Sequence, residues 1–513
     1  MLKGKSGITM GVAVFAVLAI SVLQAGAQGP ATRGGALRVI TTQGDVPCLG
    51  YGPDLRLLNQ ILDTRPVAET LVVWNDKGQP APQLAESWKL ANDQKSITFS
   101  LRKGVKFHDG TDFDAEAVKF NLEAYQKSGR AELDMVSSFD VLDKHTIRFN
   151  LKYFTNMILT QMTMNVGMMA SPTALQKMGV NEYCRNPVGT GPFKFKSWQR
   201  DLSIKFDRFE GYWQKGKPYL DSFEWVHIKD PMTALSSFIA GEADAIIGVT
   251  YAQAAELKKS GQYEIKTAYN SHTSIISDSG NPNSPFSRLK VRQAVSHAID
   301  SKAINDAIFF GLAEVTNQFS PPKGWGYNNK VVGYPYDPQK AKRLLAEAGY
   351  PNGFKTTLWF LNADVRPQVG TAVQSYLKEV GIEVEVKLLV LSAWMDKLRS
   401  GWDGLIYLGL GVTIPDDCRS GILLSNCKGT LYKSMECIKE LEDQIFKATT
   451  APDFKTKAAM FQEYNRLITD KYCVVNWIGI FPTVCVMKKN VRDSGLFDIS
   501  FLQFNPADAY LAK

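Results

Sequence analysis

The strongest constraint on the fold is that residues 34–513 form one uninterrupted stretch, without a low-complexity tract, an internal repeat or a second long apolar run. A stretch of this length, set against about 150 residues for an average domain, can bury a large core. Hydrophobic residues make up 45% of the chain and charged residues 21%. This composition excludes the disordered, collagen-like and coiled-coil classes, so we expect a compact globular protein.

Short strands and helices alternate along this stretch. Apolar residues fall at every second position in 96–101 (SITFSL) and 146–151 (TIRFNL), which is typical of half-buried strands. Farther along, strand-like segments at 356–361 and 383–389 enclose a helical segment at 369–380. This order favours an α/β sheet, and a chain this long most simply folds as two such lobes. Lobes of this class bind ligands in the crevice between them.

The first 27 residues have the features of a cleaved secretory signal. Lys3 and Lys5 precede an apolar run at 8–23, and Ala25-Gly26-Ala27 supplies the small residues of a signal-peptidase site. The run is about 16 residues long, shorter than the ~20 that a membrane helix needs, and an uncleaved anchor is the alternative. Removing these 27 residues from 513 leaves 486, and the net charge falls from +8 to +6 because two lysines are lost. No cysteine stands at the cleavage point, so we expect an unlipidated protein outside the cytoplasm.

Charge and motif patterns exclude several classes of function. The 59 basic and 51 acidic residues are nearly balanced, and no window has the Lys/Arg cluster that nucleic acids require. The five histidines are far apart, and no HExxH, GxSxG or phosphate-binding loop occurs. Gly409-Leu410-Gly411 is only a fragment of a dinucleotide-binding motif. Asp416 and Asp417 could act as an acid/base pair, but adjacent acids in a loop more often form a solvated turn. We expect no catalytic residues, no metal site and no cofactor.

Seven cysteines favour disulfides, in agreement with an oxidising compartment. They contain no CxxC pair and no nearby histidine, which argues against structural zinc. Proximity in sequence suggests two pairs, Cys418 with Cys427 across a short loop, and Cys473 with Cys485 at the ends of two apolar runs. The alternative is that several are buried small hydrophobic residues.

One long motif resembles the signature of family 5 solute-binding proteins, the peptide- and nickel-type receptors of ABC importers. This motif is 101–120, LRKGVKFHDGTDFDAEAVKF. Further blocks look like that family's and occur in its order. They are 186–193 (NPVGTGPF), 235–244 (LSSFIAGEAD), 285–311 (PFSRLKVRQAVSHAIDSKAINDAIFFG), 336–354 (YDPQKAKRLLAEAGYPNGF) and 458–470. The resemblance covers essentially the whole mature chain.

The resemblance implies an α/β, two-lobed periplasmic-binding-protein-like fold of type II, in its large family 5 form. Lobe I would comprise 34–272, with an extra subdomain at about 76–195. Lobe II would comprise 273–482, and 483–513 would return to lobe I. The chain would therefore cross the hinge twice, near 269–277 and near 480–486.

The implied function is an extracytoplasmic receptor that captures a small organic solute, a peptide or peptide-like molecule, and delivers it to an ABC importer. Its partners would be the solute and the permease subunits with their cytoplasmic ATPase. We expect a periplasmic monomer that meets the membrane only through the permease and does not bind nucleic acid. The alternatives are a receptor of the same fold for an organic acid, sugar, opine or metal chelate, a receptor that presents ligand to a sensor, and an extracytoplasmic enzyme.

Two positions bear on the choice of solute. In peptide-binding relatives a Trp after a second-lobe strand contacts the ligand, and Trp394 fits this position. An Asp in the next loop pairs with the peptide's amino terminus in those relatives, but Val412 or Thr413 stands at its place here. Because an unpaired ammonium in a closed cleft is costly, this departure argues against a peptide ligand. Asp416 or Asp417 would substitute if the loop is shifted.

The resemblance also implies which segments line the cleft: the early mature segment, a first-lobe helix, the hinge and a second-lobe strand. The expected ligand-binding residues are Asp45, Cys48, Tyr51, Phe120, Asn121, Asn270, His272, Trp394, Tyr407, Gly409 and Gly411. Each has a structural alternative, and for Phe120 a place in the core is favoured over contact with ligand.

Overall fold

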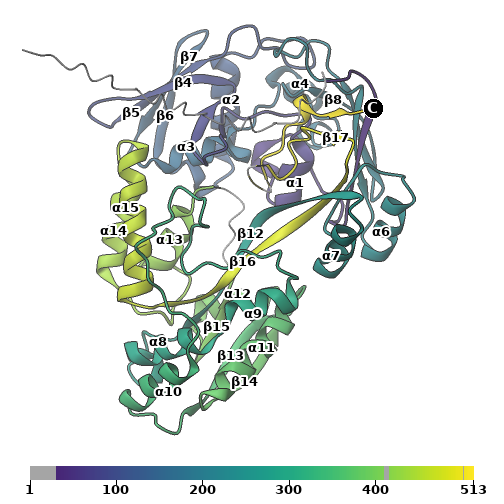
Figure 1. Ribbon diagram of the computed structural model, residues 1–513. Coiled ribbons are helices and arrows are strands. Elements are labelled where there is room, and N and C mark those ends of the chain that lie inside the picture. The colour runs from purple at the N-terminus through teal and green to yellow at the C-terminus, as the bar shows by residue number, and fades with distance from the viewer. Residues whose placement is uncertain (1–30, 410–414, 499, 501) are drawn as a thin grey trace, which may run out of the picture. The chain divides into compact units, whose positions relative to one another are not determined.

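One ten-stranded sheet runs through the computed structural model, which describes residues 31–409, 415–498, 500 and 502–513 (Figure 1). The predicted signal peptide lies outside these residues. The strands follow one another across the sheet in the order β14 (Ile382–Leu389), β13 (Phe354–Leu361), β15 (Leu405–Leu408), β12 (Tyr263–Ser277), β16 (Val475–Lys488), β11 (Ala245–Ile247), β1 (Ala36–Thr41), β10 (Ser222–His227), β9 (Ser203–Arg208) and β8 (Phe193–Gln199). Residues 32–513 form one compact unit.

Two long antiparallel strands, β12 and β16, join the two halves of this sheet. They pair from Tyr263 with Lys488 to Ile276 with Val475. At one end β16 also pairs with β11, and at the other end β12 also pairs with β15. Register shifts interrupt the pairing between Tyr269 and Ser271 and between Thr273 and Ser274. Both hinge crossings expected from the sequence fall within these strands.

A separate four-stranded antiparallel sheet has the order β4 (Ala85–Leu90), β5 (Ser96–Leu101), β7 (Thr146–Leu151) and β6 (Val136–Asp143). The alternation in β5 and β7 places Phe99 and Phe149 on the buried face, which α2 (Ala115–Lys127) covers. Two short two-stranded sheets complete the strands of the described residues: β2 (Val72–Trp74) with β3 (Pro80–Pro82), and β17 (Val491–Arg492) with β18 (Tyr510–Leu511).

The helices pack on both halves of the large sheet. The N-terminal part contains α1 (Leu58–Thr64), α3 (Met157–Met162), α4 (Pro172–Met178), α5 (Val180–Tyr183), α6 (Pro231–Ile239) and α7 (Tyr251–Ser260), of which α3 packs beneath the four-stranded sheet. The second half carries α8 (Leu289–Ala298), α9 (Ser301–Ile308), α10 (Pro338–Glu347), α11 (Arg366–Glu379), α12 (Leu391–Ser400), α13 (Cys418–Ser425), α14 (Lys439–Thr449) and α15 (Phe454–Arg466). No helix in the described ranges is long and apolar enough to span a bilayer.

Distinct hydrophobic cores define two lobes. We call the part around the core of β13–β15, α8 and α10–α15 the C-terminal lobe; Leu358, Val373 and Phe461 belong to this core. The N-terminal lobe comprises the remainder, with one core on each face of its half of the large sheet and another beneath the four-stranded sheet. The α/β prediction is confirmed, and the expected strand–helix–strand unit is β13, α11 and β14, whose strands pair in parallel.

The predicted disulfide pairs are wrong. The structure pairs Cys48 with Cys184 and Cys427 with Cys437, and it leaves Cys418, Cys473 and Cys485 buried and unbonded. Cys418 begins the eight-residue helix α13 and Cys427 follows its far end, so a rise of about 1.5 Å per residue separates the two ends by about 10 Å, beyond disulfide reach. The apolar runs around Gly479 and Pro482 are one continuous strand, not a hairpin, and β16 therefore carries Cys485 far from Cys473.

Thiol titration tests this pairing. Denatured but unreduced protein should expose three reactive thiols, and peptide mapping should place the label on Cys418, Cys473 and Cys485. Seven reactive thiols, or label on Cys48 or Cys437, would contradict the pairing. Prior reduction with a phosphine is the control and should yield all seven.

Candidate ligand-binding site

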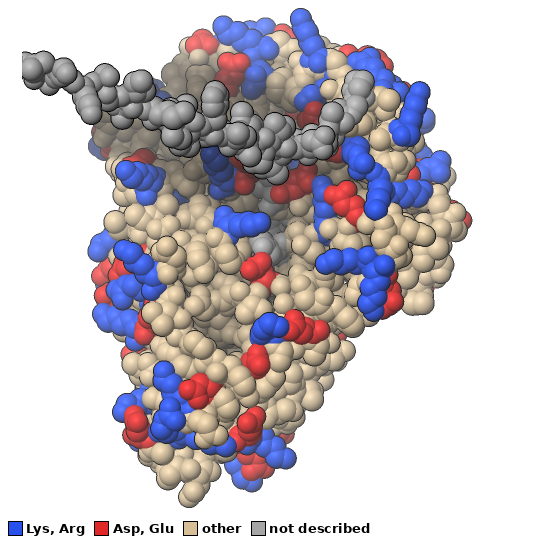
Figure 2. Space-filling view, viewed as in Figure 1, with Lys and Arg blue, Asp and Glu red and all other residues tan. Residues whose placement is uncertain are grey.

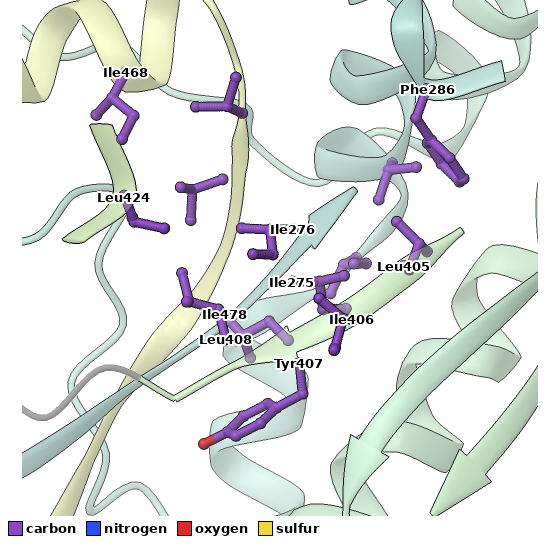
Figure 3. Close-up of a cluster of buried hydrophobic side chains, with 14 of the residues drawn as sticks. Ile275, Ile276, Phe286, Leu405, Ile406, Tyr407, Leu408, Leu424, Ile468 and Ile478 are labelled. Carbon is purple, nitrogen blue, oxygen red and sulfur yellow. The ribbon is translucent and has the colours of Figure 1, made fainter. Parts of the chain in front are cut away.

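An arginine and a tyrosine meet where the C-terminal lobe faces the long strands. Tyr407 in β15 is fully buried, and its ring points away from the apolar side chains of Ile275 and Ile276 (Figure 3). Arg366, the first residue of α11, donates from Nε to the Tyr407 hydroxyl at 3.0 Å, and its guanidinium lies 5.6 Å from the ring centroid. Asp364 accepts a hydrogen bond from the same guanidinium. The side chain of Arg366 is 17% exposed, so a partly desolvated cation stands at this point.

Tyr251, from the N-terminal lobe, packs against the core of the C-terminal lobe. It begins α7, donates its hydroxyl proton to the carbonyl oxygen of Pro482 in β16 at 2.9 Å, and packs edge-on against Phe309 at 4.9 Å. Burial raises the pKa of Tyr251; the negative charge of Asp364 raises it further and Arg366 lowers it. Tyr251 therefore packs against the C-terminal lobe, close enough to Arg366 for the guanidinium charge to influence its pKa.

His272 lies in the middle of β12 and is completely buried. Its ring lies edge-on to Phe319 at 5.4 Å and to Trp477 at 5.6 Å. Among the described residues, neither ring nitrogen has a hydrogen-bond partner. Burial lowers the pKa of His272 to about 3, so the imidazole is neutral at physiological pH. Its expected contact with solute stays a prediction.

Trp394 packs inside the C-terminal lobe. It is 6% exposed, and its Nε1 donates to the carbonyl oxygen of Tyr407 at 3.2 Å. This placement gives Trp394 a packing role and connects it to Arg366 only through Tyr407. Gly409 directly follows β15, and a side chain there would meet the Tyr407 ring at 2.7 Å. Gly411 and the side chain of Asn270 lie outside the described part of the chain.

The early residues expected at the site have other partners. Asp45 accepts from Trp198 Nε1 at 3.0 Å and pairs with Arg200 at 2.8 Å. Cys48 is bonded to Cys184, which leaves no free thiolate for a ligand or metal. The half-buried Tyr51 packs at the edge of the same region.

The two α2 residues also have structural contacts. Asn121 exchanges hydrogen bonds with the backbone of Ala170 at 2.9 and 3.0 Å, so its amide is fully used. Phe120 packs against a small core that contains Tyr183 and Leu175. Asp45, Cys48, Tyr51, Phe120 and Asn121 therefore do not form one cluster with Tyr407. Their contacts with a ligand stay predictions.

Asp416 and Asp417 are buried, and each carboxylate already accepts hydrogen bonds from other side chains. Asp416 accepts from Lys457 Nζ at 2.7 Å and from the Thr160 hydroxyl. Ser320 donates to Asp417 at 2.5 Å, and burial raises the pKa of Asp417 to about 7. The expectation of a solvated turn at these residues is wrong, because both carboxylates are buried inside the fold. Neither is free to pair with a peptide's ammonium.

Sequence reasoning missed Arg366 and Tyr251. Arg366 follows the carboxyl end of β13, and ligands in α/β sheets bind outside the carboxyl ends of strands. Searching these strand ends for a basic residue would have found it. Tyr251 had no comparable signal, because its proximity to Arg366 depends on how the two lobes meet.

The comparisons identify the family. The model of the bacterial extracellular solute-binding proteins, family 5, middle region, matches residues 79–429. The chain belongs to this family. The glutathione-binding protein GsiB of Escherichia coli O1:K1 / APEC is 36% identical over 309 residues, which are 59% of this chain and 60% of that protein. The match thus spans about three fifths of that relative's length.

Solved family 5 proteins share the two-lobed fold. DppA from Helicobacter pylori in complex with peptide STSA has a TM-score of 0.73 and 24% identity, over 94% of this chain and 99% of that one. AgaA from A. tumefaciens R10 in complex with agropinic acid has a TM-score of 0.71 and 25% identity, over 93% and 99%. The predicted two-lobed fold is confirmed.

The burial of Trp394 leads to a prediction about stability. Trp394→Ala should lower the free energy of unfolding by about 3–5 kcal/mol, because it removes a large core side chain and the hydrogen bond to Tyr407. Urea unfolding followed by circular dichroism measures this loss. Phe446→Ala, at a side chain that is 64% exposed, is the control and should change stability by less than about 0.5 kcal/mol. An unchanged midpoint for Trp394→Ala would mean that the indole is not part of the core.

Proposed function

We propose that this protein is a periplasmic receptor that captures a small carboxylate-bearing solute between its lobes and delivers it to an ABC importer. Arg366 carries this proposal. Its guanidinium is partly desolvated, and a solute carboxylate would bind the N–H groups that Asp364 and Tyr407 leave free, in a charge-assisted, bidentate contact. The identity to GsiB, named for glutathione, supports a peptide-like solute.

The loop after β15 favours glutathione over ordinary linear peptides. Residues 405–418 contain no acid other than Asp416 and Asp417, and both are occupied. An α-linked peptide would therefore leave its ammonium without a partner from this loop. In glutathione the ammonium of the γ-linked glutamate stands beside that residue's own carboxylate. The solute itself thus supplies the counter-charge that the loop lacks.

A non-peptide ligand of the same chemistry is the second candidate. AgaA is solved with agropinic acid, an acid that lacks a linear peptide's free amino terminus. An opine of this kind would also suit Arg366 without requiring an acidic partner. The two candidates share the carboxylate and differ in the rest of the solute.

We also propose the lobe limits, the removal of the signal peptide and the partners of this receptor. The lobe limits are 34–272, 273–482 and 483–513, with a subdomain at about 76–195, and the signal peptide is removed at residue 27. The partners are permease subunits with a cytoplasmic ATPase, and the receptor acts as a monomer without catalysis. On the face in Figure 2, Lys and Arg side chains are interspersed with Asp and Glu, as on an ordinary soluble surface.

Calorimetric titration of purified mature protein tests the choice of solute. Glutathione or agropinic acid should bind saturably and without turnover, and L-alanyl-L-alanine should bind at least about tenfold more weakly, equivalent to about 1.4 kcal/mol. Equal affinity for the dipeptide would contradict the argument from the missing counter-ion. Chemical conversion of any solute would contradict the receptor function.

The role of Arg366 gives a separate prediction. Arg366→Gln should weaken binding of the preferred solute by about 2–3 kcal/mol, since removing one partner of a desolvated charge pair costs this much or more. Arg366→Lys should recover only part of the loss, because an ammonium cannot reproduce the bidentate contact. Arg399→Gln, at a side chain that is 57% exposed on α12, is the matched control and should leave the affinity unchanged. Wild-type affinity in Arg366→Gln would mean that Arg366 does not bind the solute.

A further inference from the structure

The short helix α3 contributes to the cores of both lobes. Ile158 and Met162, which are one turn apart, are buried beneath the four-stranded sheet of the N-terminal lobe. Met157 points the other way, is 6% exposed, and belongs to the core of the C-terminal lobe. Since helical positions three and four apart share a face, two opposed apolar faces on six residues require a neighbour on each side. This helix is therefore a junction between the lobes, far from the crossing strands in sequence.

The residues before α3 cap a helix of the other lobe. Asn156 Nδ2 donates to the carbonyl oxygens of Ala448 at 2.7 Å and Ala451 at 3.2 Å, and its backbone N–H donates to Thr449 at 2.8 Å. The Thr155 hydroxyl also donates to Thr449, at 3.1 Å. The last carbonyls of a helix have no partner within the helix. Here the N-terminal lobe supplies partners for the end of α14.

A buried ion pair receives a hydrogen bond across the same junction. The Asp416 carboxylate is fully buried and pairs with Lys457, whose side chain is 5% exposed. Asp416 precedes α13 and Lys457 lies in α15, both in the C-terminal lobe. The Thr160 hydroxyl, on the same face of α3 as Met157, donates to this carboxylate. A buried ion pair is stable only when its remaining hydrogen-bonding sites are also satisfied. Separation of the lobes would leave Asp416 without this bond.

Asp416 also lies at the end of the loop that leaves β15 beside Tyr407. Trp325 Nε1 donates to the carbonyl oxygen of Pro415 at 2.5 Å, and Lys457 lies 5.5 Å from the Trp325 ring. The end of the loop is therefore fixed within the C-terminal lobe, while Thr160 holds it from the other lobe. A movement of α3 away from Asp416 would break the Thr160 hydrogen bond at this end of the loop.

We propose that Asn156, Met157 and Thr160 form a closure latch with Asp416, Lys457 and the end of α14. The latch joins the lobes at the edge of the cleft and supplies part of the free energy of closure, independently of the solute. The proposal deepens the receptor function, on which it rests, by naming contacts outside the solute site that set the balance between open and closed forms. A stronger latch slows solute release, and a weaker one speeds it.

The test removes one hydroxyl. Thr160→Val keeps the shape of the side chain and leaves the Asp416–Lys457 pair in place, but it breaks the bond between the lobes. Thr163→Val is the matched control: Thr163 is also 2% exposed, and its hydroxyl donates to the Thr160 carbonyl at 2.8 Å within one lobe. Spin labels on Asn92→Cys and Lys447→Cys, one exposed position on each lobe, report the distance between the lobes by pulsed dipolar spectroscopy, with and without glutathione.

The latch predicts that Thr160→Val lowers the ratio of closed to open molecules by about tenfold, whether or not glutathione is present, since a hydrogen bond to a charged group is lost. Thr163→Val should leave this ratio unchanged. The latch is overturned if Thr160→Val and wild-type protein give the same distance distribution in both conditions, or if wild-type protein shows no closed population in either. If Thr160→Val shifts the distance distribution toward open molecules but glutathione changes the distribution of neither protein, the latch is supported and the proposed solute is contradicted.

Discussion

The pairing of β12 with β16 holds the two lobes together, and the remaining structure depends on it. Each strand begins in one lobe and ends in the other, so both crossings of the chain run side by side and share a ladder of backbone hydrogen bonds. Bulges near Tyr269 and Thr273 interrupt the ladder at mid-length. A continuous ladder would resist bending, whereas a bulge leaves backbone groups unpaired and allows the strand to bend. The pair is thus continuous enough to connect the lobes, and its two irregularities are where we expect the hinge.

Close contacts around this hinge explain several local features. Gly479 in β16 approaches the carbonyl oxygen of Glu314, which would lie 2.8 Å from any added side chain. Only glycine allows this segment to pair with the strand, through hydrogen bonds between Glu314 and Ile480. The neutral His272 sits among aromatic rings in the adjacent strand. Polar groups of this kind are costly to bury, so the hinge is less stable than an all-apolar core of equal size.

The proposed solute site and the proposed latch use different residues of the same two lobes. Arg366 begins α11 and Tyr251 begins α7, whereas the latch joins the segment around α3 to α14 and α15. A solute bound at Arg366 and the bonds from Asn156 and Thr160 therefore favour the same arrangement of the lobes. Because the contributions act on one equilibrium, affinity depends on residues that never touch the solute.

The sequence by itself determined the local elements and the family. The period-two pattern of β5 and β7 and the N-cap of α10, where Asp337 accepts from the Lys340 N–H at 2.8 Å, depend only on neighbours along the chain. The motif at 101–120 indicated the fold for the same reason, since it encodes a turn and a helix start.

Only the tertiary structure decided the disulfides, the burial of Trp394 and Asp416, and the packing of Tyr251 against the C-terminal lobe. Cys48 lies 136 residues from Cys184, and Thr160 lies 256 residues from Asp416. Cys48 and Cys184 meet when the N-terminal lobe folds, whereas Thr160 and Asp416 meet only when the two lobes pack together. Periodicity and spacing describe neighbours within a few turns. They carry no information about which segments, far apart in the chain, come together in the folded protein.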